Sequence, residues 1–169
     1  LVSVDGRYLY LGTSMMLTVL DTEDESVVYQ IEPVGEPGGQ GVFPFTVDSA
    51  NRIAYVSLGS HVGFDVVDLQ QERIIHQVLV GDEPILHRTH GVALNPDETE
   101  LWISDQAGRK LFIFDLTQSP PAPKGHVDLS MGGHGWITFS LDGAYAYSHT
   151  PDIFDVRTRR KVASLAGPD

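Results

Sequence analysis

The chain repeats one pattern of short strands four times along its 169 residues. A turn rich in Gly, Asp or Asn is followed by an aromatic-centred strand, a short loop, an apolar strand that ends in Asp, and one further strand. The aromatic-centred strands are Tyr8–Leu11, Ile53–Val56, Leu101–Ser104 and Tyr145–Ser148. A period of about 40–47 residues that carries only short strands is typical of β-propeller blades. The repeat therefore predicts an all-β propeller.

We expect residues 1–169 to form a single portion of a β-propeller, built from about four four-stranded antiparallel blades. The expected blades are residues 1–33, 42–81, 90–130 and 135–166. No stretch of helical length has an i, i+3, i+4 apolar stripe, so no helix is expected. Because Leu1 falls inside a strand pattern, we expect a fragment of a larger propeller of about six to eight blades. The remaining blades would come from the same or another chain, and a half-ring that closes with a second copy is the alternative.

The composition excludes several classes of function. The formal net charge of −12 argues against a nucleic-acid partner, because phosphate binding needs clustered Lys and Arg. No apolar run approaches the ~20 residues that a transmembrane helix needs. The chain has no Cys, which excludes disulfides and thiolate metal sites. We expect an exported protein, periplasmic or extracellular.

Two short segments depart from the repeat. Ser119–Pro123 carries three prolines, and proline cannot donate to a strand ladder, so we expect a long loop on the rim. The basic residues cluster once, between two expected strands, and we interpret this cluster as a solvated turn. It consists of Arg157, Arg159, Arg160 and Lys161.

Five of the seven histidines fall in connections that should open on one face of a propeller, around the mouth of its central channel. They are His87, His90 and His134 in connections between blades, and His61 and His149 in connections between the second and third strands. Loops on a rigid scaffold are where binding and catalytic residues usually collect. A polar surface role, or a hydrogen bond to a neighbouring carbonyl, is the alternative for His61 and His149.

Two of these histidines occur in the same local context. His90-Gly91 and His134-Gly135 each precede the strand expected to lie nearest the axis, where glycine allows a close backbone approach. Asp105 ends the next strand and could supply a carboxylate at the same mouth. Such a set suits a divalent metal ion, or general acid–base work on a small ester or lactone. The candidate metal ligands are His90, His134 and Asp105.

The two tryptophans are expected to differ in role. Trp102 occupies the strand slot shared with Tyr10, Tyr55 and Tyr147, and we expect it in the core. Trp136 follows the second His-Gly pair. We expect it to pack between blades, with stacking on a ligand at the mouth as the alternative.

The tetrapeptide Tyr55-Val56-Ser57-Leu58, with its neighbouring turn and Asp-ended strand, resembles the YVTN family of β-propeller repeats. The turns Asp5-Gly6-Arg7 and Asn95-Pro96-Asp97-Glu98 are similar to that family's Ser-Pro-Asp-Gly-Lys turn. The resemblance covers all four repeats and implies the propeller fold. Related propellers serve as binding scaffolds, surface-layer components, lyases and lactonases, so function has to be argued from the site.

A second resemblance is local. The segment from His90 to Asp97, together with Ser104-Asp105, is similar to the Asn-Gly-x-Ala-x-x-Pro-Asp…Asp stretch of the gluconolactonase family. In that family the residue before the glycine is a metal ligand. The resemblance assigns that position to His90, where this chain has His in place of Asn.

From these patterns we expect a propeller scaffold that binds a small molecule or a protein at the channel mouth. The candidate ligand face consists of His61, His87, His90, Asp105, His134, Trp136 and His149. The alternative is a metal-assisted, lactonase- or lyase-like hydrolase in which His90 and His134 act as metal ligand or base. A purely structural repeat module is the third hypothesis.

Overall fold

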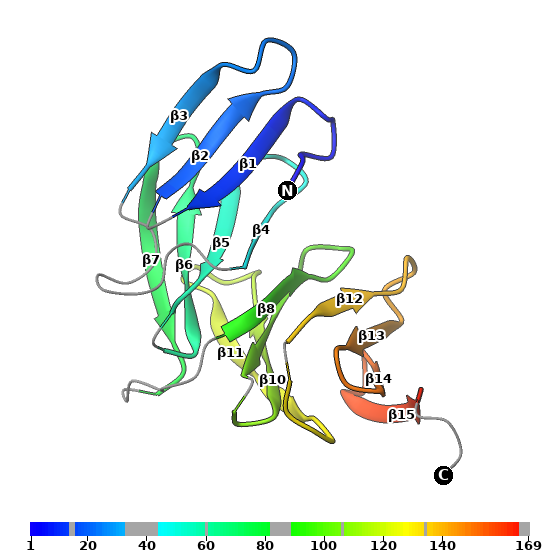
Figure 1. Ribbon diagram of the computed structural model, residues 1–169. Coiled ribbons are helices and arrows are strands. Elements are labelled where there is room, and N and C mark those ends of the chain that lie inside the picture. Colours follow the sequence, from blue (N-terminus) through cyan, green and yellow to red (C-terminus); the bar gives the residue numbers. More distant parts are fainter. Residues whose placement is uncertain are drawn as a thin grey trace. The chain divides into compact units, whose positions relative to one another are not determined.

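The computed structural model describes residues 1–13, 16–32, 44–59, 61–81, 89–105, 107–133 and 135–165. Within these residues the chain forms fifteen β-strands and no helix. The strands make four antiparallel sheets, shown in Figure 1. The chain divides into two compact units, Leu1–Arg88 and Thr89–Asp169, with two sheets in each. We call the sheets blades 1 to 4 in chain order.

Unit 1 contains blades 1 and 2. Blade 1 has three strands in the order β1-β2-β3, which are β1 (Tyr8–Thr13), β2 (Met16–Asp21) and β3 (Val27–Ile31). Val2 extends this sheet through an isolated antiparallel bridge to Leu9. Blade 2 has four strands in chain order, which are β4 (Phe45–Val47), β5 (Ile53–Ser57), β6 (Gly63–Asp68) and β7 (Arg73–Leu79).

Unit 2 contains blades 3 and 4, each with four strands in chain order. Blade 3 comprises β8 (Thr89–Leu94), β9 (Glu100–Asp105), β10 (Lys110–Asp115) and β11 (Ala122–Asp128). Blade 4 comprises β12 (Ile137–Phe139), β13 (Tyr145–Ser148), β14 (Asp152–Asp155) and β15 (Arg160–Ser164). Each sheet is a simple meander, which is the construction of a propeller blade.

The turn that precedes the aromatic-centred strand (β1, β5, β9 or β13) has the same geometry in all four blades. In each turn one backbone N–H donates to the carbonyl three residues earlier, at 2.9–3.0 Å. The donor residue lies in the left-handed region, with φ between 55° and 73°. These donors are Gly6, Asn51, Glu98 and Gly143. Gly and Asn accept this conformation at low cost, so the turn residues set the repeat.

The Asp that ends the strand after the aromatic-centred strand also has a structural role in each blade. Its carboxylate accepts a backbone N–H from the turn that follows, at 2.7–3.0 Å, as short polar side chains commonly do in turns. The four residues are Asp21, Asp68, Asp115 and Asp155.

The proline-rich segment is not entirely a loop, so that part of the sequence prediction was wrong. Strand β11 begins at Ala122 and includes Pro123. Proline is tolerated here because β11 is the edge strand of blade 3. A bulge between Ile113 and Phe114 in the β10–β11 pairing places Pro123 opposite Phe114 and leaves Lys124 unpaired in the ladder.

Each unit is held together by a hydrophobic core between its two blades. In unit 1 Tyr10 and Val19 of blade 1 pack with Ala54, Val56 and Val67 of blade 2. In unit 2 the core is built in the same way. Its buried members are Trp102, Leu111, Ile113, Val127, Leu129, Ala146 and Phe154.

The same strand slot supplies the large side chain in both cores. Tyr10 and Trp102 each lie two residues after the start of their strand and are almost fully buried. Trp102 packs edge-on against Phe139 of blade 4, with ring centroids 5.5 Å apart. The expected core position of Trp102 is confirmed.

Candidate functional site

The candidate site of unit 2 is built where the first strands of its two blades meet. Strands β8 and β12 are edge strands of their sheets and are in contact. A Cβ atom on Gly91 would overlap the backbone carbonyl of Gly135, and Gly135 has a φ of 68°. Neither position tolerates a side chain. The two glycines therefore let the inner edges of blades 3 and 4 approach closely.

Trp136 and His90 form an aromatic pair at this junction. Their ring centroids are 6.4 Å apart and the ring planes are inclined by 77°, which is an edge-to-face arrangement. His90 is half-buried, whereas Trp136 is 68% exposed. The expectation that Trp136 packs between the blades was wrong. The inter-blade core begins one residue later, at Ile137, so it does not cover the indole.

Ser104 is part of the junction and was missed by the sequence reasoning. Its Oγ lies 3.1 Å from the position that a Cβ on Gly91 would take, and a Cβ on Gly135 would overlap it. The side chain is fully buried, and within the described residues its hydroxyl has no hydrogen-bond partner. Nothing in the local sequence marks this serine, because its environment is made by two segments distant in the chain.

Asp105 lies at the same end of blade 3, opposite Thr89 in the ladder. Its Oδ1 accepts backbone N–H groups from Ala107 and Gly108, at 3.1 and 2.9 Å. This carboxylate therefore shapes the β9–β10 turn. Within the described parts of the chain, no three His, Cys, Asp or Glu side chains are grouped to hold a metal ion.

The remaining histidines of the candidate face have different positions. His149 follows β13 and packs on Gly133, whose Cβ would lie 2.6 Å from the His149 ring. Gly133 lies two residues before Gly135 in the chain, so this contact places His149 at the junction end of blade 4. His61 belongs to unit 1, where it is half-buried between β5 and β6. His87 and His134 lie outside the described residues.

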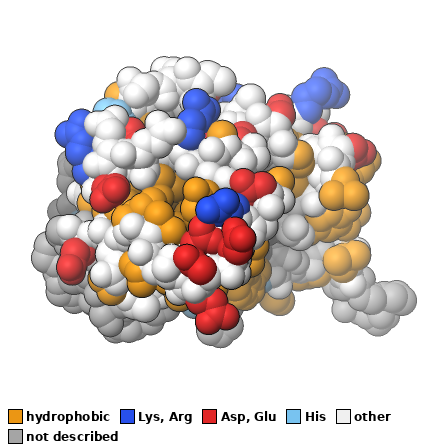
Figure 2. Space-filling model, turned by 90° about the horizontal axis from the view of Figure 1, so that it is seen from above, with side chains coloured by type: hydrophobic (Ala, Val, Ile, Leu, Met, Phe, Trp, Pro, Cys, Tyr) orange, Lys and Arg blue, Asp and Glu red, His pale blue; other side chains and the backbone are white. Residues whose placement is uncertain are grey.

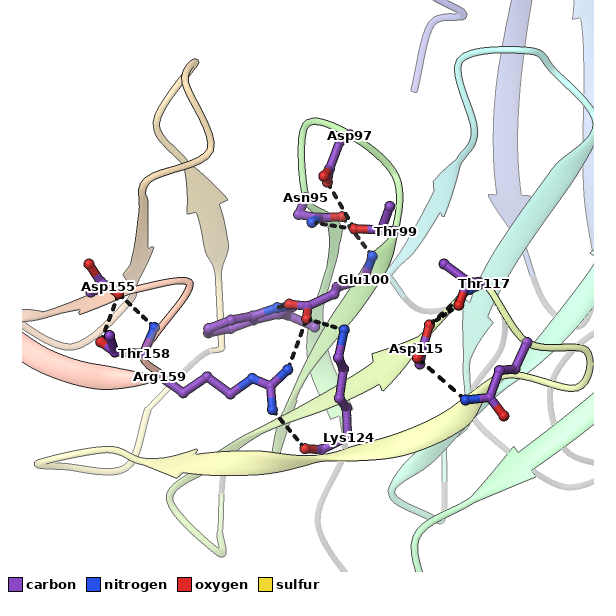
Figure 3. A network of polar contacts seen from close by, with 12 residues as sticks. Asn95, Asp97, Thr99, Glu100, Asp115, Thr117, Lys124, Asp155, Thr158 and Arg159 are labelled. Atoms are coloured by element: carbon purple, nitrogen blue, oxygen red, sulfur yellow. Dashed lines mark hydrogen bonds and ion pairs between the residues drawn. The ribbon is translucent and has the colours of Figure 1, made fainter.

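A second polar cluster lies at the opposite end of the blades of unit 2 and centres on Glu100 (Figure 3). The buried carboxylate accepts hydrogen bonds from Lys124 at 2.9 Å, Arg159 at 3.0 Å and the Trp102 indole at 3.0 Å. Burial raises the pKa of Glu100, but these three donors outweigh it, so the pKa lies below its usual value. Arg159 also donates to the Lys124 carbonyl at 2.9 Å. Blade 4 is thereby clamped to blade 3.

A third cluster surrounds Asp152 at the start of β14. Burial raises the pKa of this carboxyl, but Lys161, Ser130 and Thr150 lower it to about 2. The Lys161 ammonium lies 2.5 Å from Oδ1, and Thr150 Oγ1 donates to Oδ2 at 2.8 Å. Lys161 and Arg159 thus engage buried carboxylates, so the basic cluster is not simply a solvated turn. Sequence reasoning missed this because both partners lie in other strands.

The described residues include no helix with the length and hydropathy to cross a membrane.

In the part of the chain that the structure describes, one surface combines an exposed aromatic, a histidine and two closely approaching backbones. That surface is the junction of Gly91, Gly135, His90 and Trp136.

Comparison with known proteins supports the fold. No protein-family model matches the chain, and no curated protein matches it. Solved structures do match. The hydrazine synthase of Kuenenia stuttgartiensis has a TM-score of 0.76 and 18% sequence identity over 96% of this chain. Dihydro-heme d1 dehydrogenase NirN, in complex with DHE, has a TM-score of 0.72 and 18% identity over 97%.

Both of these proteins contain β-propellers, and the chain spans 46% of the length of the first and 35% of the second. At this level of identity the likeness concerns the fold alone. It agrees with the four meander sheets, their repeated turns and the cores between successive blades. The four sheets of this chain are β-propeller blades.

Proposed function

We propose that this chain is a YVTN-type propeller portion of an exported protein, and that it acts as a binding scaffold. Its ligand face is the junction of His90 and Trp136, flanked by Asp105 and His149. His134 is predicted from the sequence to belong to the same face, and His61 and His87 remain candidates from the sequence alone. The ligand is a small molecule or a loop of a partner protein.

The exposed indole of Trp136 is the observation that carries this proposal. A tryptophan buries a large apolar area when it is covered, so leaving it 68% exposed is costly unless another molecule covers it. The indole is also oriented, because His90 contacts it edge-on and Gly135 positions the backbone beside it. An oriented aromatic face with an adjacent imidazole suits a planar ring that carries a hydrogen-bonding group.

Binding of small ring compounds tests the proposal. We would screen aromatic and sugar-ring fragments by ligand-observed NMR and measure affinities for the wild type, Trp136→Ala and Leu141→Ala. Leu141 is a matched control, because it is an exposed large apolar residue in the turn at the other end of blade 4. We expect Trp136→Ala to weaken binding by about tenfold or more, as loss of a stacked aromatic does, and Leu141→Ala to leave it unchanged. Binding that survives Trp136→Ala would refute the proposal.

Metal-assisted hydrolysis is the second candidate function. It is favoured by the contact between the two His-Gly segments, because Gly91 and Gly135 meet and each follows a histidine in the sequence. Among the described residues no three His, Cys, Asp or Glu side chains are grouped to hold a metal ion, so this candidate assumes that His134 supplies a ligand beside His90. Elemental analysis of protein purified without chelators would show near-stoichiometric metal if this candidate is correct. Its absence, together with unchanged lactone hydrolysis in a His90→Ala/His134→Ala variant, would reject it.

A further inference from the structure

Among the described residues, one sheet face of blade 1 and one of blade 4 remain partly exposed, although the equivalent faces of other blades are buried. In blade 4 this is the tyrosine face, which consists of Tyr145, Tyr147, Ile153 and Ala163. Together with Asp155 and Val162 it lines a groove of about 340 Å³, and Tyr145 is 42% exposed. In blade 1 it is the leucine face, which consists of Leu9, Leu11 and Leu20, where Leu11 is 40% exposed. The leucine face is apolar, and the tyrosine face combines exposed ring and aliphatic atoms with the Asp155 carboxylate. Exposed surfaces of this kind commonly mark sites of association.

The repeat shows what covers a surface like the tyrosine face. The residue two positions into the second strand of the pattern is Tyr10 in blade 1, Trp102 in blade 3 and Tyr147 in blade 4. Tyr10 belongs to one buried cluster with Ala54 and Val56 of blade 2. Trp102 belongs to one with Ala146 and Phe154 of blade 4. The sheet face that carries this aromatic residue in one blade is therefore covered by the next blade, on the face opposite to that blade's own aromatic residue.

The leucine face is the corresponding face of blade 1, opposite to its aromatic residue Tyr10. Leu9 immediately precedes the aromatic residue Tyr10, just as Ala54 precedes Tyr55. Side chains alternate along a strand, so Leu9 and Leu11 lie on the face opposite Tyr10. Leu9 pairs with Leu20 across the β1–β2 ladder. The chain thus carries both halves of the blade-to-blade contact that it makes twice internally.

Blades 1 and 4 also carry opposite charges beside these two faces. In unit 2 the positive-φ residue of the β14–β15 turn, Arg159, reaches Lys124, the bulged residue of the preceding blade's last strand. The corresponding turn residue of blade 1 is Glu25, at a φ of 61°, within the acidic segment 21–25. The corresponding bulge in β15 is Val162, which has Arg160 and Lys161 beside it. An acidic turn would therefore meet a basic strand.

The acidic turn is exposed as this contact requires. Figure 2 looks down onto the upper end of Figure 1, where the β2–β3 connection lies, and shows acidic side chains gathered beside exposed hydrophobic ones. Glu23, Asp24 and Glu25 are all exposed, and the Arg7 guanidinium pairs with the Asp21 carboxylate at 2.7 Å. The turn thus has surplus negative charge in a position to contact a basic partner.

We propose that two copies of this chain associate head to tail, with the tyrosine face of blade 4 in one copy packed on the leucine face of blade 1 in the other. The contact repeats the packing of blade 4 on blade 3 and places Glu25 of one copy near Arg160 of the other. It is independent of the ligand face, because it uses other surfaces of blades 1 and 4.

Complementary variants test the proposal by light scattering. Leu11→Arg blocks the leucine face and Tyr145→Arg blocks the tyrosine face, with the same change in net charge. Both side chains are partly exposed, and circular dichroism and thermal melting check that each variant folds. The wild type should show at least twice the chain mass of 18.5 kDa. Each variant alone should show the chain mass, because neither retains both halves of a contact. An equimolar mixture should regain twice that mass, because one intact contact is restored.

Several outcomes would overturn the proposal. A wild type that stays at 18.5 kDa up to its solubility limit would show that no second copy covers these faces. Association that survives in either variant alone would place the contact on another surface. If Arg160→Glu weakens association and a second change, Glu25→Arg, does not restore it, the proposed orientation is wrong. We expect the reversal to cost about two- to fivefold in affinity, as exposed ion pairs do, and the double variant to regain it.

Discussion

Replacing Glu100 by Gln should destabilise unit 2 by about 2 kcal/mol, because the carboxylate is the shared acceptor of the clamp between blades 3 and 4. Glutamine has nearly the same shape and can still accept from the Trp102 indole. It loses the negative charge that holds Lys124 and Arg159. The substitution therefore isolates the ionic part of the clamp.

The magnitude follows from the burial of each partner. Removing one member of a fully buried ion pair typically costs about 3–5 kcal/mol. The Glu100 side chain is only 9% exposed, but those of Lys124 and Arg159 are 37% and 28% exposed. Both cations can turn toward water in the variant, which lowers the cost to about 2 kcal/mol. Glu32→Gln is a matched control, because it makes the same chemical change at an exposed position.

Urea unfolding followed by tryptophan fluorescence measures the effect, since Trp102 is buried beside Glu100. Because the folded-state pKa of Glu100 is lowered, its contribution is fully present above the unfolded pKa of about 4.3. It should be lost as the pH falls through the folded-state pKa, where the wild type and Glu100→Gln converge. If Glu100→Gln stays within about 0.5 kcal/mol of the wild type at pH 7, the clamp does not stabilise the blade pair.

Three further substitutions test the junctions between blades by thermal or urea unfolding. Gly91→Ala should destabilise by about 1–3 kcal/mol or prevent folding, because its methyl group would overlap the Gly135 carbonyl; a neutral effect would show that the inner edges do not meet. Asp152→Asn should cost about 2–4 kcal/mol at neutral pH, and because the folded pKa is about 2, this difference should persist to about pH 4 and vanish only below it. Tyr10→Phe should cost about 1 kcal/mol through the lost hydrogen bond to Asn51, 3.0 Å long; no loss would argue against that contact.

Local sequence pattern predicted the elements whose cause is local. The positive-φ turns follow from Gly6, Asn51 and Gly143, and the Asp-ended strands follow from carboxylates that cap the next turn. Such residues act within three or four positions along the chain. The all-β fold, the blade construction and the core position of Trp102 could therefore be derived without a structure.

The features that sequence reasoning missed depend on contacts between blades. Arg159 looked like a surface cation because its partner, Glu100, lies in another blade. Trp136 looked like a core residue because it is a large aromatic beside an expected strand. The inter-blade core begins one residue later, at Ile137. Pro123 was excluded from a strand because its edge position cannot be read from the segment itself. In each case the deciding neighbour is distant in the chain.

The candidate site was predicted in part for the same reason. The repeated His-Gly pairs indicated a close backbone approach to the propeller axis at Gly91 and Gly135, and the structure brings these two glycines into contact with each other. The buried hydroxyl of Ser104 and the exposed indole of Trp136 belong to the same junction but carry no local signal. The metal ligands and the role of the histidines remain predictions.

The binding role of the His90–Trp136 junction is tested most directly by the two indole N–H resonances in an NMR titration. The chain contains only two tryptophans, one exposed at the junction and one buried between the blades. Fragments that bind the protein should shift the resonance of Trp136 and leave that of Trp102 in place. If bound fragments leave the Trp136 resonance unchanged and shift signals from the turns around Glu100 instead, the ligand face lies at the other end of the blades and the account is wrong.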